Sequence, residues 1–165
     1  MSLRELILED VVTTLRKIQG VGAGDTDFKT TVNTVVEGQF SPEDYPADAI
    51  LLCVFEQAYG WQNNAIRAAS GNDFPATYIV AVRAFVRGAA RDIHALKGAL
   101  KDDIGRALYI DRKRGQTAVN FTAPAPVDTI AVQFAGDQVE QSGAGAIATF
   151  LVAITITFLV DPADP

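Results

Sequence analysis

The sequence predicts an α+β domain: a mixed or mostly antiparallel sheet of five to six strands with two main helices packed on one face. Residues 149–160 (TFLVAITITFLV) alternate large apolar side chains with smaller, partly hydroxylic ones, and a period of two is the side-chain period of a β-strand. Residues 3–18 and 90–109 instead repeat their apolar positions every three or four residues, which is the helical period. Helices and strands alternate only in part along the chain, and this order favours an α+β fold.

Length and composition indicate one globular domain spanning residues 1–165. Of the 165 residues, 48% are hydrophobic and 21% are charged, which supplies a core and is too little charge for a disordered chain. The net charge of −6 is uneven, because residues 25–48 and 128–165 are acidic whereas residues 83–114 hold nine Lys or Arg and four acids. Opposed charged segments predict head-to-tail self-association or a complementary partner, and the acidic total argues against general nucleic-acid binding.

The first helix is predicted over residues 3–18. Ser2 is placed to cap it, and Glu5, three positions further on, completes a capping box. Three glycines then end the helix and open a loop: Gly20, Gly22 and Gly24. They follow a helix rather than a strand, so they do not match a dinucleotide-binding fingerprint.

The first part of the sheet is predicted from β-branched and apolar runs. Residues 29–37 are rich in threonine and valine, residues 50–55 form a short apolar run typical of an interior strand, and residues 76–87 alternate with a period of two. Residues 38–48, which are acidic and contain two prolines, are predicted as a loop. Gly88 is expected to end the strand over residues 76–87.

The second part begins with the helix over residues 90–109 and a basic turn at residues 111–115. Two shorter strands are predicted at residues 116–122 and 129–134, separated by an Ala-Pro-Ala-Pro segment. Residues 136–145 are predicted as a polar turn region that leads into the long final strand.

Residues 56–73 have weak periodicity and are predicted as a long loop or a hairpin arm. They contain Tyr59 and the only tryptophan of the chain, Trp61. Exposed Tyr and Trp side chains are favoured anchors of protein interfaces, so both are candidate contact residues. The alternative is that Trp61 folds back to cover the edge of the sheet.

Four arginines are further candidates for a protein interface. Arg83 and Arg87 share the less apolar face of the strand over residues 76–87, and Arg112 and Arg114 lie in the basic turn. Their expected role is to pair with acids, such as the acidic loop or tail of a neighbouring copy. Contact with phosphate is the alternative.

No catalytic constellation stands out. Cys53, the only cysteine, lies among apolar residues and is expected to be a buried thiol, and His94, the only histidine, is expected on the solvated side of a helix. The acids at 43–48 are a weak candidate site for a hard cation or a carboxylate-based enzyme, and those at 102–103 are expected to form a solvated, ion-paired surface. Residues 141–160 carry no charge, but their β-branched alternation favours a strand over a membrane helix. The sequence therefore predicts a protein that is not an enzyme and uses no cofactor.

The order and lengths of these elements resemble those of the tail terminator proteins of long-tailed bacteriophages and related prophage tail-completion proteins. The resemblance covers most of the chain. It is clearest at residues 76–110, where a strand runs straight into a helix (YIVAVRAFVRGAARDIHALKGALKDDIGRALYID), and at residues 145–161, which contain the long last strand (ATFLVAITITFLVD).

This resemblance implies a structural role. Members of the family form a ring, commonly a hexamer, that caps the tail tube, ends its polymerisation and provides the surface joined by the head. The implied partners are further copies of the chain, the tail tube protein and a head-completion or connector protein, with DNA passing through the ring and no membrane involved. The implied location is the tail or neck of the virion, after assembly in the host cytoplasm. Another neck or head-completion component is the second structural interpretation.

Overall fold

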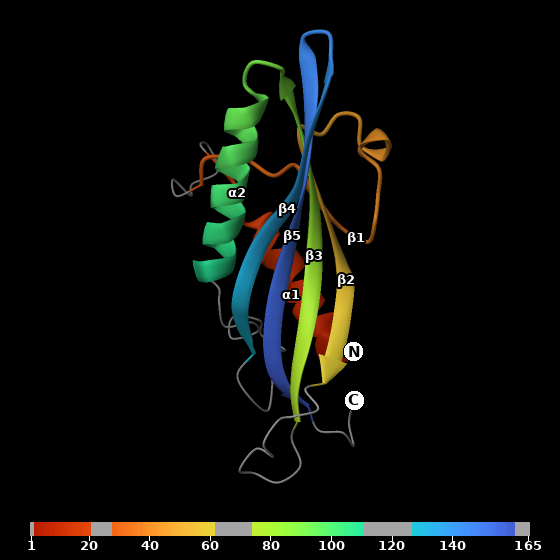
Figure 1. Ribbon diagram of the computed structural model, residues 1–165, viewed down its shortest axis with the longest axis vertical. Coiled ribbons are helices and arrows are strands. Elements are labelled where there is room, and N and C mark those ends of the chain that lie inside the picture. Colours follow the sequence, from red (N-terminus) through yellow and green to blue (C-terminus); the bar gives the residue numbers. More distant parts are fainter. Residues whose placement is uncertain (1, 21–27, 62–73, 111–126, 161–165) are drawn as a thin grey trace.

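The computed structural model describes residues 2–20, 28–61, 74–110 and 127–160, which form two α-helices and a five-stranded sheet (Figure 1). In chain order the elements are α1 (Leu3–Arg16), β1 (Thr34–Glu37), the 3-10 turn η1 (Pro42–Asp44), β2 (Ile50–Trp61), β3 (Phe74–Ala89), α2 (Ile93–Ile110), β4 (Asp128–Ser142) and β5 (Gly145–Val160). The predicted α+β class is confirmed. The strand predicted at residues 116–122 and the basic turn at 111–115 lie outside the described residues.

The sheet has the order β1-β2-β3-β5-β4. β1 pairs with β2 in parallel and every other neighbouring pair is antiparallel, so the sheet is mixed. The last strand, β5, lies inside the sheet and pairs with β3 from Gly145, opposite Ala89, to Val160, opposite Phe74. This position explains the sequence of β5, because an interior strand needs a fully apolar side toward the core.

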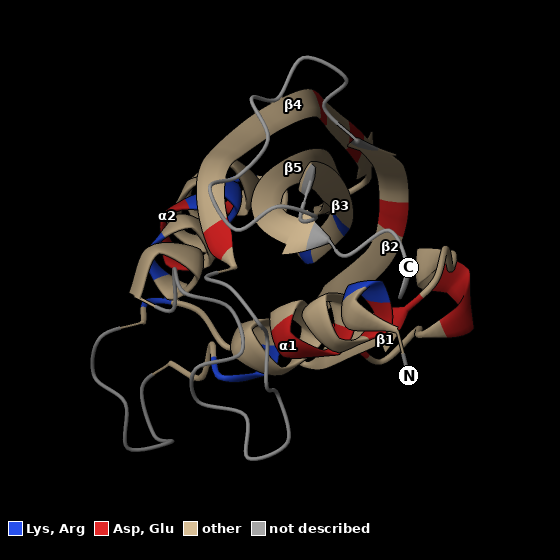
Figure 2. Ribbon diagram, turned by 90° about the horizontal axis from the view of Figure 1, so that it is seen from below, with Lys and Arg blue, Asp and Glu red and all other residues tan. Residues whose placement is uncertain are grey.

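Both helices pack on the same face of the sheet, and the main core lies between the helices and the strands (Figure 2). α1 packs against β1 and β2, whereas α2 packs against β3, β4 and β5. The large alternate side chains of β5, from Phe150 to Phe158, point into this core, and those of Phe150, Val152, Ile154 and Ile156 are completely buried. The period of two in the sequence therefore identified the core face of the strand correctly.

α1 begins at the predicted capping box. The Ser2 backbone N–H donates to Glu5 Oε2 at 2.6 Å, and the Glu5 N–H donates to Ser2 Oγ at 3.3 Å. The hydrogen bond from the Ser2 backbone lowers the pKa of the Glu5 carboxyl. The helix ends at Arg16, and Ile18, at the end of the predicted span, is nevertheless fully buried.

β1 is shorter than the strand predicted over residues 29–37, because the start of that segment binds to α2. The Asp103 carboxylate accepts hydrogen bonds from the backbone N–H groups of Lys29 at 2.9 Å and Thr30 at 2.7 Å. It also accepts one from the Thr30 hydroxyl at 2.7 Å. Asp103 is only 2% exposed, so the prediction of a solvated surface is wrong for this residue. The adjacent Asp102 is exposed and pairs with Lys29 Nζ at 3.2 Å, as expected.

The prediction that Gly88 ends its strand is wrong, since β3 continues to Ala89. A Cβ at Gly88 would lie 2.7 Å from Cδ1 of Leu96, so the missing side chain leaves room for α2 beside the strand. The glycine serves helix–sheet packing here.

The prediction of a polar turn over residues 136–145 is also wrong. β4 extends to Ser142 and β5 begins at Gly145, which leaves a two-residue turn between them. Gly136 has a φ of 66° where the register of β4 with β5 shifts, between Ala135 and Gln138. Glycine adopts this left-handed conformation readily, so it forms a bulge inside a continuous strand.

Candidate interaction surface

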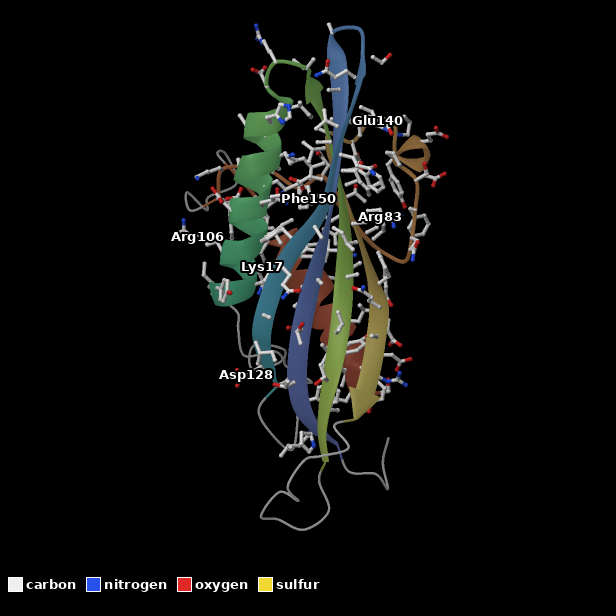
Figure 3. All side chains as sticks on the ribbon, in the orientation of Figure 1. Lys17, Arg83, Arg106, Asp128, Glu140 and Phe150 are labelled. Atoms are coloured by element: carbon white, nitrogen blue, oxygen red, sulfur yellow. The ribbon has the colours of Figure 1, made fainter. Side chains whose placement is uncertain are left out.

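The sheet has a second face, opposite the helices, that neither helix covers. Its central side chains are small, apolar or hydroxylic and are partly exposed: Ile79, Phe85, Leu151, Ala153 and Thr155. Arg83 is the exposed charge on β3 at this face and points away from α2 (Figure 3). This low polarity makes the second face a candidate interaction surface.

Arg87 fixes the loop of residues 38–48 over one end of the second face. Its Nη1 donates to the backbone carbonyls of Tyr45 at 3.0 Å and Pro46 at 2.6 Å, and its Nη2 donates to the carbonyl of Pro42. The Arg87 backbone N–H donates to the Ala49 carbonyl at 2.7 Å, which ties the end of the loop to β3. The guanidinium that was predicted to contact a partner is thus engaged within the chain.

The loop buries the only cysteine. Cys53 has no exposed surface, and its Sγ lies 3.8 Å from the Phe40 carbonyl oxygen. Burial raises the pKa of the Cys53 thiol, which disfavours the reactive thiolate. Cys53 is a packing residue in this structure.

The four arginines predicted at an interface are therefore not equivalent. Arg83 is exposed on the second face and Arg87 is held by the loop. Arg112 and Arg114 lie outside the described residues.

Tyr59, predicted as an exposed anchor, is half-buried against the core. Its ring stacks on Phe158, with centroids 6.3 Å apart, and meets Tyr78 edge-on at 6.4 Å. The Arg4 guanidinium lies over the Tyr59 ring, 4.6 Å from its centroid, and Arg4 also pairs with Glu56 at 3.7 Å. These contacts join the start of α1 to the far end of β2. The side chain of the second predicted anchor, Trp61, lies outside the described set.

Tyr78 is almost completely buried beneath this cluster. Burial, and secondarily the Glu56 carboxylate, raise the pKa of the Tyr78 hydroxyl well above its usual range. The hydroxyl therefore stays protonated at neutral pH.

A patch of large apolar side chains is exposed where the end of α2 meets β4. Four residues form this edge patch, with exposed fractions of 59%, 67%, 59% and 38%: Tyr109, Ile110, Ile130 and Phe134. Among the described residues, only Phe40 is another large hydrophobic side chain with comparable exposure. A Cβ added at Gly105 of α2 would lie 3.9 Å from the Phe134 ring, which shows how closely the helix passes the strand.

Sequence reasoning missed the edge patch, although β4 was predicted in part. Ile130 is exposed because the register of β4 with β5 shifts between Thr129 and Ala131, and this bulge breaks the alternation. The signal that was available is Tyr109 and Ile110, two large apolar residues that lie outside the buried stripe of their helix.

An ion-pair cluster clamps β4 to α2 beside this patch. Asp137, next to the Gly136 bulge, accepts from Lys101 Nζ at 2.6 Å and from Lys97 Nζ at 3.2 Å. The Lys101 ammonium also lies 5.2 Å from the centroid of the Phe150 ring. The hydrogen bond from Lys101 is the main cause of the lowered pKa of Asp137.

A hollow of about 390 Å³ lies between β3 and the hairpin that joins β4 to β5. Its walls include Arg87 of β3, Ile147 of β5 and Glu140 of β4. These three residues are register partners and so form one row across the sheet. Arg87 is already bonded to the loop, and the other lining side chains belong to Glu140, Gln141, Ser142, Ala146 and Ile147.

The carboxylates of residues 43–48 do not converge on a metal-binding geometry. Asp44 accepts a hydrogen bond from the Ser41 backbone N–H at 3.0 Å and so caps η1. Within the described residues, no three His, Cys, Asp or Glu side chains are placed to hold a metal ion together. His94 is exposed on α2, as expected.

Neither a protein-family model nor a curated protein matches this chain. Neither of the two described helices combines the length and the apolar character needed to cross a membrane.

Proposed function

We propose that this protein is a structural component of a bacteriophage tail: a terminator that assembles into a hexameric ring, caps the tail tube and offers a surface to the head. The sequence resemblance at residues 76–110 and 145–161 supports the proposal. These segments form β3, α2 and β5, which are the centre of the sheet and the longer of its two helices.

The edge patch is the observation that carries the proposal. Exposed large apolar side chains that gather on a surface mark sites of protein interaction. Two of the four, Ile130 and Phe134, lie on β4, the outermost strand on that side of the sheet, and the other two lie at the end of α2. An edge strand exposes backbone groups that readily pair with another chain unless the protein protects them. A ring in which each copy covers the edge patch of its neighbour satisfies both requirements.

The proposed partners are further copies of the chain, the tail tube protein on one side of the ring and a head-completion or connector protein on the other. The ring surrounds the path of the DNA without reading its sequence. The second face and the edge patch supply separate surfaces for these contacts, since the sheet edge and the sheet face point in different directions (Figure 2).

Electron microscopy of particles from a phage or prophage that lacks the gene tests the proposal. A terminator is expected to yield overlong tails, whereas another neck component is expected to yield normal tails detached from heads. Particles of normal length with heads attached would contradict both.

The same assay identifies the surface that tail termination requires when the deletion is complemented with variant proteins. Ile130→Asp places a charge in the edge patch and is expected to leave tails overlong. Gln138→Asp adds the same charge at an exposed position of β4 outside the edge patch and is the matched control for the folding of the strand. The control is expected to complement the deletion. Full complementation by Ile130→Asp would show that the edge patch is not needed to end tail growth.

A further inference from the structure

We infer that neighbouring copies in the ring join their sheets, with β4 of one copy pairing antiparallel with the second half of β2 of the next. This inference rests on the proposed ring and names its subunit contact. It follows from the positions of β4 and of the second half of β2 within a single chain.

β4 supplies one side of the contact. It is the outermost strand on its side of the sheet, and its 15 residues contain no lysine, arginine or proline. Those are the residues that proteins commonly place on edge strands to prevent pairing. The charges of β4 are the acids Asp128, Asp137 and Glu140, of which Asp137 is neutralised by two lysines of α2.

The second half of β2 supplies the other side. β1 pairs with β2 only from Leu51 to Val54, whereas β2 continues to Trp61. Among the described strands, none lies beside the outer edge of residues 55–61. β2 thus extends past its neighbour by roughly half of its length.

The two segments stand at the same height in the sheet. The register runs from Ala131 through Thr155 and Ile79 to Ala58, so Ala131 and Ala58 occupy one row. In the same way Gln133 shares a row with Phe55. Residues 128–133 and 55–60 therefore cover the same rows.

Both segments also contain one extra residue. β4 has a register shift between Thr129 and Ala131, and β2 has one between Glu56 and Ala58. The two six-residue runs are consequently equal in length as well as in height.

Strand direction fits the same contact. Three antiparallel steps separate β2 from β4, so the two strands run in opposite directions within one chain. A rotation about an axis along the strands preserves these directions and brings β4 antiparallel to β2 of the next copy. Because no shift along the axis is needed, such a contact closes into a ring rather than a filament.

No like charges face each other directly in this contact. Asp128 shares a row with Gly60, and Glu56 shares a row with Val132. The pairs Ala131–Ala58 and Gln133–Phe55 are uncharged.

Disulfide trapping tests this contact. In a Cys53→Ala background, the double variant Ala58→Cys/Ala131→Cys places two thiols in one row on opposite edges. Directly opposed residues of an antiparallel pair have Cα atoms about 4.5–5.5 Å apart, within the range a disulfide spans. After oxidation we expect a ladder of linked chains, up to the full ring, on a non-reducing gel, and we expect reductant to collapse it.

Three controls make the result specific. Each single-cysteine variant is expected to give no ladder, because one thiol per chain links at most two chains. Ala58→Cys combined with Ala135→Cys moves one thiol four rows away, and we expect at least a tenfold smaller linked fraction. Thermal melting of every variant, compared with the Cys53→Ala protein, verifies that it is folded.

The outcomes separate this contact from the proposed function. If folded double variants stay oligomeric by light scattering but form no ladder, the contact is refuted and the ring is retained. Equal linking by the offset control also refutes the contact. If the linked ladder forms but deletion of the gene leaves particles normal, the contact is retained and the terminator role is refuted.

Discussion

Replacement of Asp103 by alanine tests how the first segment of the chain is fixed to α2. The carboxylate is 2% exposed and accepts from two backbone N–H groups and one hydroxyl, all in the segment that leads into β1. Without it, the N–H and hydroxyl of Thr30, a buried residue, lose their acceptor. Each orphaned buried group costs about 1–3 kcal/mol, so we expect Asp103→Ala to lower the free energy of unfolding by about 3 kcal/mol.

The adjacent Asp102 provides a matched control. The Asp102 side chain is 69% exposed, and the Lys29 side chain with which it forms an ion pair is 65% exposed. Asp102→Ala is therefore expected to change the free energy of unfolding by less than about 1 kcal/mol. Urea denaturation followed by circular dichroism measures both values.

If Asp103→Ala and Asp102→Ala have the same free energy of unfolding, Asp103 does not fix the first segment to α2. Asp103→Asn adds a third point, because an amide keeps one acceptor oxygen but loses the charge. It is expected to fall between the wild type and Asp103→Ala. A stability equal to that of the wild type would show that the charge of Asp103 adds nothing to these hydrogen bonds.

Two further changes test the loop and the clamp. Arg87→Ala removes the donors that hold the loop of residues 38–48, so we expect alkylation of Cys53 at pH 8 to accelerate at least tenfold. Arg91→Ala, which replaces an exposed arginine, is expected to leave the alkylation rate unchanged. Equal rates in the wild type and both variants would contradict the role of Arg87. Asp137→Asn tests pH dependence. The folded-state pKa of Asp137 is lowered, so its stabilising effect is present above the unfolded pKa of about 4 and is lost as the pH falls through the folded value. The stability gap between wild type and Asp137→Asn, measured by urea denaturation, should be larger at pH 7 than at pH 2.5, and a gap independent of pH would contradict the clamp.

The core of the fold could be predicted because its signals are local. The alternation over residues 149–160 and the helical periods of α1 and α2 each depend on residues close in sequence. The capping box at Ser2 is also local, since both of its hydrogen bonds join residues three positions apart.

The wrong predictions concern residues whose structural role depends on residues that are distant in sequence. Gly88 was read as a strand end but leaves room for Leu96, and Gly136 was read as part of a turn but forms a bulge inside β4. Asp103 resembles its solvated neighbour in sequence, yet it binds a segment 73 residues away. No local pattern distinguishes these roles.

The sequence could not show which of the predicted contact residues are exposed. The sequence indicated contact with other proteins through Tyr59 and Arg87, but Tyr59 packs on Phe158 and Arg87 binds loop carbonyls. Exposure depends on what the rest of the chain covers, which a single segment does not encode. The edge patch depends on α2 lying beside β4 (Figure 1), which neither segment encodes alone.

Native mass spectrometry of the purified wild-type protein over a range of concentrations tests whether the chain forms a closed ring. We expect one closed assembly of identical chains, a hexamer, with no open-ended series of larger species. A monomer at every concentration, or an unbounded series of lengths, would contradict a ring built from this chain.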